Sequence, residues 1–247
     1  MFATIFRSAL YFIWFALVSA VLNVGCLPLL LFPRRVTMWA PKAWCAALLW
    51  GLKWIAGLDY EVRGQVPADG VIVASKHMSM WDTIALYHTL HDSVFVVKKQ
   101  LMSVPLYGWY ARKVEMIPID REAGASALRS MAAEARAALA RGRAIVIFPE
   151  GTRKKPDAPP DYKPGVAALY GQLAVPCVPV ALNSGLFWTG PAGFLKKRGT
   201  IVLEYLDPIP AGLNRAEFMR ILEERIESTT AKLVSEGNAR LSQVRLR

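Results

Sequence analysis

A long hydrophobic run near the N-terminus restricts where this chain can reside. No residue from Ser8 to Phe32 carries a charge. As a helix the run would be about 37 Å long, which is enough to cross the roughly 30 Å hydrocarbon core of a bilayer. Pro28 interrupts it, and a second apolar stretch from Met38 to Leu58 contains two lysines. This pattern predicts a membrane anchor made of a spanning helix, an interfacial helix or a helix hairpin.

A cleavable signal peptide is the alternative interpretation of the first run. No small-residue cleavage site precedes the sequence Pro33-Arg34-Arg35, and this favours an anchor that is retained. If the first segment spans alone, Arg34 and Arg35 lie on the cytoplasmic side. A hairpin anchor also leaves the rest of the chain in the cytoplasm. We therefore expect an anchor at residues 1–58 and one further domain, at residues 59–247.

Composition narrows the class of partner. The chain has 30 Lys and Arg against 19 Asp and Glu, a net charge of +11, which favours an anionic membrane, a phosphorylated substrate or nucleic acid. A hydrophobic content of 54% with 8 Trp favours lipid. The basic tail from Arg240 to Arg247 lacks an aromatic platform for stacking bases, so we expect an anionic membrane surface and no nucleic acid as partner.

After Tyr60 the sequence alternates between two kinds of pattern. Short apolar runs bounded by turn signals predict strands at residues 71–75, 93–97, 116–120, 144–148, 175–182 and 200–206. Helical patterns lie between several of them, at residues 83–90, 123–141 and 164–173. Asn214 with Glu217 predicts a capping box that opens a last helix. Strands that alternate with helices indicate an α/β domain.

His77 and Asp82 lie directly after the first of these strands, in the sequence SKHMSMWDT (75–83). In one continuous helix this spacing would separate the side chains by about 140°, so they could not meet. They can meet if His77 lies in the turn and Asp82 in the first helical turn. The carboxylate would then fix the imidazole tautomer and leave the other nitrogen free to accept a proton. We predict a general base, His77, with Asp82 as its partner; a purely structural pair is the alternative.

The sequence FPEGTR (148–153) follows the strongest predicted strand, at the strand end where α/β sheets place ligand sites. Backbone N–H groups around Gly151, the Thr152 hydroxyl and the Arg153 guanidinium suit a phosphate group. We therefore expect Glu150, Gly151, Thr152 and Arg153 to contact the substrate. The alternative is a turn that carries a solvated arginine.

Two more cations follow predicted strands. Lys98 comes after residues 93–97 and Arg121 after residues 116–120. Strand ends therefore deliver Lys98, Arg121 and Arg153 to the same edge as His77. Singly, each is consistent with a solvated charge; together they predict an anion pocket beside a general base.

The sequence offers little support for other catalytic chemistry. It contains no GxSxG motif, and its three cysteines are far apart and not near a histidine, which disfavours a covalent intermediate and a zinc knuckle. His88, His91 and Asp92 are similar to a metal-ligand cluster, but a helix end near the surface also explains them. We predict no metal. Residues 187–199 mix aromatic with basic side chains and indicate either a membrane contact or a hairpin loop.

The ordered motifs resemble those of the glycerolipid acyltransferases, typified by bacterial 1-acyl-sn-glycerol-3-phosphate acyltransferase. The resemblance covers roughly residues 60–210, and Lys98 lies where that family carries a substrate-phosphate lysine. Lys76 is a departure, since many members have asparagine before the histidine. The four matching motifs are His77 with Asp82, Ile117 to Arg121, Phe148 to Arg153, and Val178-Pro179-Val180.

The resemblance implies a mixed, largely parallel sheet flanked by helices and preceded by a hydrophobic two-helix membrane motif. It also implies direct transfer of a fatty acyl group from acyl-CoA or acyl-carrier protein, without a cofactor, to the sn-2 hydroxyl of 1-acyl-sn-glycerol-3-phosphate (lysophosphatidic acid). The product, phosphatidic acid, enters phospholipid biosynthesis. The expected location is the bacterial inner membrane, with the catalytic domain facing the cytoplasm. The alternatives are an acyltransferase for another lyso-lipid, such as lyso-ornithine lipid, and a catalytically silent membrane-associated lipid-binding protein.

Overall fold

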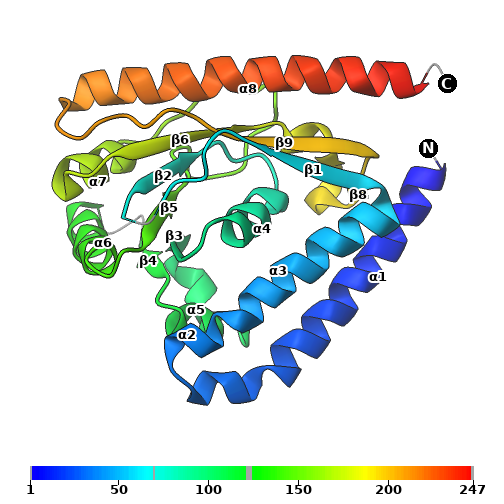
Figure 1. The fold of residues 1–247 in the computed structure, drawn as a ribbon, viewed down its shortest axis with the longest axis horizontal. Coiled ribbons are helices and arrows are strands. Elements are labelled where there is room, and N and C mark those ends of the chain that lie inside the picture. The colour runs from blue at the N-terminus through cyan, green and yellow to red at the C-terminus, as the bar shows by residue number, and fades with distance from the viewer. Residues whose placement is uncertain (1, 69, 121–123, 246–247) are drawn as a thin grey trace.

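The chain folds around a seven-stranded sheet. The computed structural model describes residues 2–68, 70–120 and 124–245 (Figure 1). The strands lie in the order β1-β9-β6-β2-β5-β3-β4, and every pair is parallel except β6 with β9. This confirms the predicted mixed, largely parallel sheet. The strands are β1 (Leu58–Arg63), β2 (Ile72–Ser75), β3 (Ser93–Lys98), β4 (Ile117–Ile119), β5 (Ala144–Ile147), β6 (Cys177–Leu182) and β9 (Gly199–Tyr205).

One strand of this sheet is missing from the sequence-based prediction. The six predicted runs match β2, β3, β4, β5, β6 and β9, whereas β1 does not appear as an apolar run because it carries Asp59, Glu61 and Arg63. As the edge strand of the order, β1 pairs on one side with β9, in the register Leu58 to Gly199. Charged side chains are common on edge strands, where they face solvent and prevent pairing with other chains.

Helices cover both faces of the sheet. On one face α6 (Gly124–Leu139), α7 (Gly165–Leu173) and α8 (Arg215–Arg245) pack on a buried cluster that includes Ile72, Ile145 and Phe218. On the other face α4 (Met80–Thr89) packs around Trp81. Figure 1 shows α8 along one side and α4 on the opposite side. Half of the capping box predicted for the last helix is present: Asn214 Oδ1 accepts the backbone N–H of Glu217 at 3.0 Å, while the Glu217 carboxylate accepts the side-chain amide of Asn214 at 3.3 Å.

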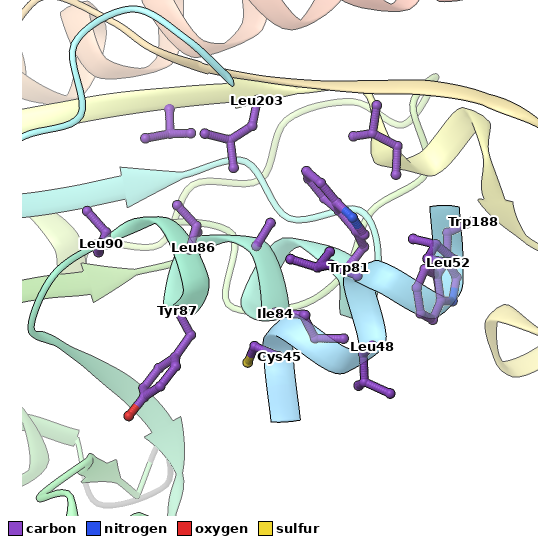
Figure 2. Packing of buried hydrophobic residues seen from close by; sticks show 14 of the residues in the cluster. Cys45, Leu48, Leu52, Trp81, Ile84, Leu86, Tyr87, Leu90, Trp188 and Leu203 are labelled. Atoms are coloured by element: carbon purple, nitrogen blue, oxygen red, sulfur yellow. The ribbon is translucent and has the colours of Figure 1, made fainter. Parts of the chain in front are cut away.

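The N-terminal segment packs against the same core as α4. It consists of α1 (Phe2–Gly25), the 3₁₀ turn η1 (Leu27–Leu31), α2 (Arg34–Thr37), α3 (Trp39–Gly51) and the π-helical turn η2 (Leu52–Ala56). The indole N–H of Trp14 on α1 donates to the carbonyl of Ala47 on α3 at 3.0 Å. Figure 2 shows Leu48 and Leu52 beside Trp81 of α4. The segment is thus held by the hydrophobic core of the catalytic part of the chain.

The outer side of α1 is apolar and exposed. Only 11% of the most apolar stretch of this helix is buried. Among the described residues, α1 is the one helix that is long and apolar enough to cross a membrane. Exposed apolar side chains on it include Phe6, Ile13, Leu17 and Val21. Exposed apolar surface of this extent marks an interaction site and is consistent with membrane association.

Residues 188–196 form the hairpin that was one of two interpretations for this segment. Strands β7 (Trp188–Thr189) and β8 (Leu195–Lys196) are antiparallel. The backbone N–H of Lys196 donates to the Ser8 hydroxyl of α1 at 2.9 Å, so the hairpin supports the N-terminal helix.

Candidate active site

His77 lies in the turn between β2 and α4. The backbone N–H of Lys76 still pairs with the carbonyl of Val180 in β6, and the chain then leaves the sheet. Helix α4 begins three residues after His77, which places Asp82 in its first turn. The Nδ1 atom of His77 lies 2.9 Å from Oδ2 of Asp82. This is the geometry that the five-residue spacing predicts.

Asp82 is fully buried and saturated with hydrogen bonds. Its Oδ2 accepts the backbone N–H groups of Met78 at 2.6 Å and Ser79 at 2.8 Å, as well as His77. Its Oδ1 accepts the hydroxyls of Ser79 and Ser184. One carboxylate therefore caps the helix and orients the imidazole. Because the Asp82 carboxylate accepts the hydrogen bond from Nδ1–H of His77, Nε2 of His77 is left as the proton acceptor.

The FPEGTR segment packs directly on the histidine. The Phe148 ring stacks on the His77 ring with centroids 3.9 Å apart and an angle of 18° between their planes. The backbone N–H of Lys154 donates to the carbonyl of His77 at 2.9 Å. Gly151 has a φ of +65°, a left-handed conformation that glycine adopts without strain, and its N–H donates back to the Phe148 carbonyl. The loop is therefore fixed at both ends against the turn that carries His77.

A cavity of about 1290 Å³ opens beside His77. Lys98, Gly151, Thr152 and Arg153 line the same cavity, so the structure brings together four of the predicted substrate-contacting residues with the predicted base. Arg121 lies outside the described residues. A deeper, apolar part of the cavity extends between the N-terminal helices, α4 and α5 (Tyr107–Lys113), where it is lined by Trp44, Ile84, Tyr87 and Tyr110.

Lys98 and Arg153 reach the cavity from parallel strands that end at one edge of the sheet. Lys98 is the last residue of β3, and Arg153 follows β5, the neighbouring strand. Both side chains are exposed. Within the residues that the structure describes, neither makes a hydrogen bond or an ion pair. Two uncompensated cations thus face a cavity that also contains a histidine.

Comparisons with known proteins agree with this arrangement. A family model described as Acyltransferase matches residues 59–183. Over 231 residues the chain is 31% identical to the 1-acyl-sn-glycerol-3-phosphate acyltransferase of Pseudomonas aeruginosa. This alignment covers 93% of this chain and 87% of that protein. The chain belongs to the 1-acyl-sn-glycerol-3-phosphate acyltransferase family. It is accordingly an acyltransferase of lipid biosynthesis.

One more curated protein and one solved structure are also similar to this chain. The lyso-ornithine lipid O-acyltransferase of Pseudomonas aeruginosa is 29% identical over 231 residues, with 86% of this chain and 83% of that protein covered. The crystal structure of the 1-acyl-sn-glycerophosphate (LPA) acyltransferase, PlsC, from Thermotoga maritima superimposes with a TM-score of 0.75. The match covers 92% of this chain and 96% of that one at 19% sequence identity. At this identity the superposition shows a shared fold.

Glu150 differs from the expectation for the site. It was predicted to contact substrate, but the structure buries its side chain, which is not among those that line the cavity. Its Oε1 accepts the Lys76 ammonium at 3.0 Å. Burial raises the pKa of Glu150, and the hydrogen bond and charge of Lys76 oppose that rise. The sequence could not show this because Lys76 and Glu150 are far apart along the chain.

His88, His91 and Asp92 do not form a metal site. Among the described residues, no group of three or more His, Cys, Asp or Glu is arranged to hold a metal ion. Asp92 binds two arginines instead: Nη1 of Arg34 at 3.0 Å and Nε of Arg143 at 3.0 Å. These ion pairs fasten α2 of the N-terminal segment to the end of the sheet.

Two residues that shape this acyltransferase site were missed by sequence reasoning. Ser184 follows β6 and donates to Asp82 across a separation of 102 residues, and no local signal marks it. Phe148 was part of the FPEGTR motif, but its aromatic side chain was not assigned a role. The hydrophobic residue at the start of that motif was a signal that could have predicted the stacking on His77.

Proposed function

We propose that this acyltransferase moves a fatty acyl group from acyl-CoA or acyl-carrier protein to the sn-2 hydroxyl of 1-acyl-sn-glycerol-3-phosphate, giving phosphatidic acid. The observation that carries the proposal is one cavity lined by His77, which Asp82 orients, and by Lys98 and Arg153, two cations without a partner among the described residues. A lyso-lipid with a phosphate group needs both features, a base for its hydroxyl and a counter-charge for its headgroup.

In the proposed mechanism Nε2 of His77 accepts the proton of the acceptor hydroxyl while the alkoxide oxygen attacks the thioester carbonyl. The new C–O bond forms as the proton moves, and a tetrahedral oxyanion results. Collapse of this intermediate breaks the C–S bond, and the imidazolium returns the proton to the departing thiolate. The products are the ester and the free thiol, and His77 is again neutral. Asp82 holds Nδ1–H throughout and stabilises the imidazolium.

Direct transfer makes a covalent acyl-enzyme unnecessary. The hydroxyls of Ser79 and Ser184 both donate to Asp82, the partner of the base, within a buried network and do not line the cavity. A serine nucleophile would need its hydroxyl hydrogen-bonded to the histidine and open to the substrate. We therefore propose a mechanism that needs no cofactor and no protein nucleophile.

The phosphate of the acceptor is proposed to bind between Lys98 and Arg153. A phosphomonoester near pH 7 carries close to two negative charges, so it gains more from two cations than from one. The guanidinium can donate two parallel hydrogen bonds to phosphate oxygens, and the exposed Thr152 hydroxyl adds another donor. Arg121, which lies outside the described residues and follows β4 in the sequence, is proposed as a third cation.

A second candidate acceptor is supported by the relatives. The lyso-ornithine lipid O-acyltransferase of Pseudomonas aeruginosa is nearly as similar to this chain as the lysophosphatidic acid relative. Its name indicates an acceptor without a phosphate. The two exposed cations in the cavity favour the phosphorylated acceptor, because the nearly two negative charges of a phosphomonoester compensate them better than an ornithine headgroup, which carries one carboxylate and one ammonium.

An acyl-transfer assay with a panel of acceptors tests the proposal. The purified full-length protein is given one acyl-CoA and, in separate reactions, lysophosphatidic acid, lyso-ornithine lipid and monoacylglycerol of the same chain length. The proposal predicts the highest kcat/KM with lysophosphatidic acid. A higher value with lyso-ornithine lipid would contradict it. Repeating the assay with an acyl-carrier protein donor determines which carrier is used.

We also propose that the protein resides on the bacterial inner membrane, anchored by residues 1–58, with the catalytic domain on the cytoplasmic side. Deleting the anchor would expose the core that it covers, so point variants are the better test. Replacing Phe6, Ile13 and Leu17 on α1 by Gln removes apolar surface from exposed positions. The triple variant should be released from membranes by salt, whereas Val66→Gln, an exposed change elsewhere, should not. Retention of the triple variant would contradict the anchor.

A further inference from the structure

Lys76 is a buried lysine that has no part in the proposed mechanism. It directly precedes His77, and its side chain is 1% exposed. Its ammonium lies 3.0 Å from Oε1 of Glu150 and 2.8 Å from Oε1 of Glu227 on α8. His77 lines the cavity and Lys76 does not, so the two neighbouring side chains serve different sides of the strand end.

Lys76 is the cation on which Glu150 depends. The Glu150 side chain is 1% exposed, its Oε1 binds Lys76, and its Oε2 is buried without a hydrogen-bond partner. A buried carboxylate with one missing partner is costly, and losing the cation that is hydrogen-bonded to it would leave a charge that the interior solvates poorly. Lys76 therefore holds the side chain of Glu150, in addition to the contacts that fix the two ends of the FPEGTR loop.

Glu150 belongs to the segment that carries the phosphate-binding groups. Its neighbours Gly151, Thr152 and Arg153 line the cavity, and Phe148 stacks on His77. Fixing Glu150 therefore fixes the segment at a point between the base and the guanidinium. The ion pair joins the residue before His77 to the segment that carries Arg153.

The second carboxylate ties this pair to the rest of the fold. Oε1 of Glu227 also accepts the hydroxyl of Tyr162 at 2.9 Å, and Tyr162 lies in the loop between Arg153 and α7. Lys76 thus links the strand end, the FPEGTR segment and α8, and Glu227 extends the link to the loop that leads away from Arg153. One carboxylate would be enough to neutralise the charge of Lys76, but two are bonded to it.

We propose that Lys76 is a positioning residue that sets the distance between the general base and the phosphate-binding arginine. It does so through Glu150 and without touching substrate. The inference rests on the proposed function, in which His77 is the base and Arg153 binds the acceptor phosphate. It gives the FPEGTR glutamate a defined task, since Glu150 is the residue through which Lys76 acts.

A double-mutant cycle tests this role. Lys76→Met keeps the length of the side chain and removes the charge. If Lys76 acts by placing Arg153, Lys76→Met should lower kcat/KM for lysophosphatidic acid by roughly ten- to a hundredfold, since a misplacement of about 1 Å has effects of this size. In the Arg153→Ala background the same change should cost less than about threefold, because the group that it positions is gone.

Lys196→Met is the matched control. Lys196 is also a buried lysine, but it binds the carbonyls of Gly193 and Phe194 beside α1 and does not contact the FPEGTR segment. Any loss of activity that it causes through stability should be the same fraction in the wild-type and Arg153→Ala backgrounds. If Lys76→Met lowers kcat/KM by the same factor in the wild-type and Arg153→Ala backgrounds, the positioning role is overturned.

A milder variant keeps the test decisive if Lys76→Met does not fold. Glu150→Gln retains the shape of the cluster and removes the charge through which Lys76 acts. It should reduce the preference for lysophosphatidic acid over monoacylglycerol by about two- to fivefold, with little effect on monoacylglycerol itself. An unchanged preference would contradict the proposal. If Arg153→Ala itself leaves the use of lysophosphatidic acid intact, the proposed function fails instead, which separates the two outcomes.

Discussion

The two sides of the cavity are built in opposite ways. On the side of the base, His77 and Asp82 are bound by neighbours, and both oxygens of the buried carboxylate are saturated. On the side of the cations, Lys98 and Arg153 are exposed and have no partner within the part of the chain that the structure describes. One side is internally complete, and the other is complete only when an anion is present.

This difference corresponds to the two tasks that we propose for the site. A general base must keep one tautomer and one orientation through every turnover, and this favours a fully hydrogen-bonded and buried support. A binding site for a charged headgroup must keep its charges available, because a cation already paired with a carboxylate contributes less to binding. Substitutions on the two sides should therefore differ in size and in dependence on the acceptor.

The largest effect is expected on the side of the base. His77→Ala should lower kcat by about 10² or more for every acceptor, since it removes the proton acceptor from the transition state. The thermal midpoint should change little, because the histidine is at the cavity surface and Asp82 keeps its four other donors. Steady-state kinetics with lysophosphatidic acid and monoacylglycerol check this. Near-normal turnover with either acceptor would show that another group is the base.

Next in size are substitutions of Arg153. Arg153→Lys should keep the charge but lose the two-pronged hydrogen bonding, and kcat/KM for lysophosphatidic acid should fall by about tenfold. Arg153→Ala should lose ten- to a hundredfold, equivalent to about 1.5–3 kcal/mol for a hydrogen bond to a charged group. A matched control is Arg112→Ala, an exposed arginine of α5 that does not line the cavity. Equal losses in the Lys and Ala variants would argue against bidentate recognition.

The smallest effect is expected at the support of Asp82. Ser184→Ala removes one of two hydroxyl donors to Oδ1 and leaves Ser79 in place. Turnover should fall by about two- to tenfold, equally for all acceptors, because the change weakens the orientation of His77 and leaves headgroup binding intact. A loss confined to lysophosphatidic acid would indicate that Ser184 serves the headgroup side.

The sequence predicts some features of the base side and the cation side of the cavity but not others. The pairing of His77 with Asp82 could be predicted, because the strand end and the helix start fix where residues five apart can lie. Lys98 and Arg153 could be placed at one edge because parallel strands share their direction. What could not be predicted depends on contacts between distant residues: Ser184 with Asp82, and Lys76 with Glu150. Periodicity describes which face of an element is buried but does not identify its partner.

The fold shows the same division. Strands with apolar runs were predicted correctly, whereas β1 was missed because Asp59, Glu61 and Arg63 give it the composition of an exposed segment. The hydrophobic helices were predicted as an anchor, but their packing on Trp81 of α4 was not. Aromatic and aliphatic residues suit both lipid and protein interiors, so composition alone does not separate the two surfaces of α3.

The most direct test of the account is the acceptor preference of Arg153→Ala. The ratio of kcat/KM for lysophosphatidic acid to that for monoacylglycerol of the same chain is measured in the wild type, in Arg153→Ala and in Ser184→Ala. The wild type should strongly prefer lysophosphatidic acid. Arg153→Ala should lower this ratio by about ten- to a hundredfold with little change for monoacylglycerol, and Ser184→Ala should keep the wild-type ratio. A wild type that uses both acceptors equally, or an Arg153→Ala variant with an unchanged ratio, would contradict the claim that the cation side binds the acceptor phosphate.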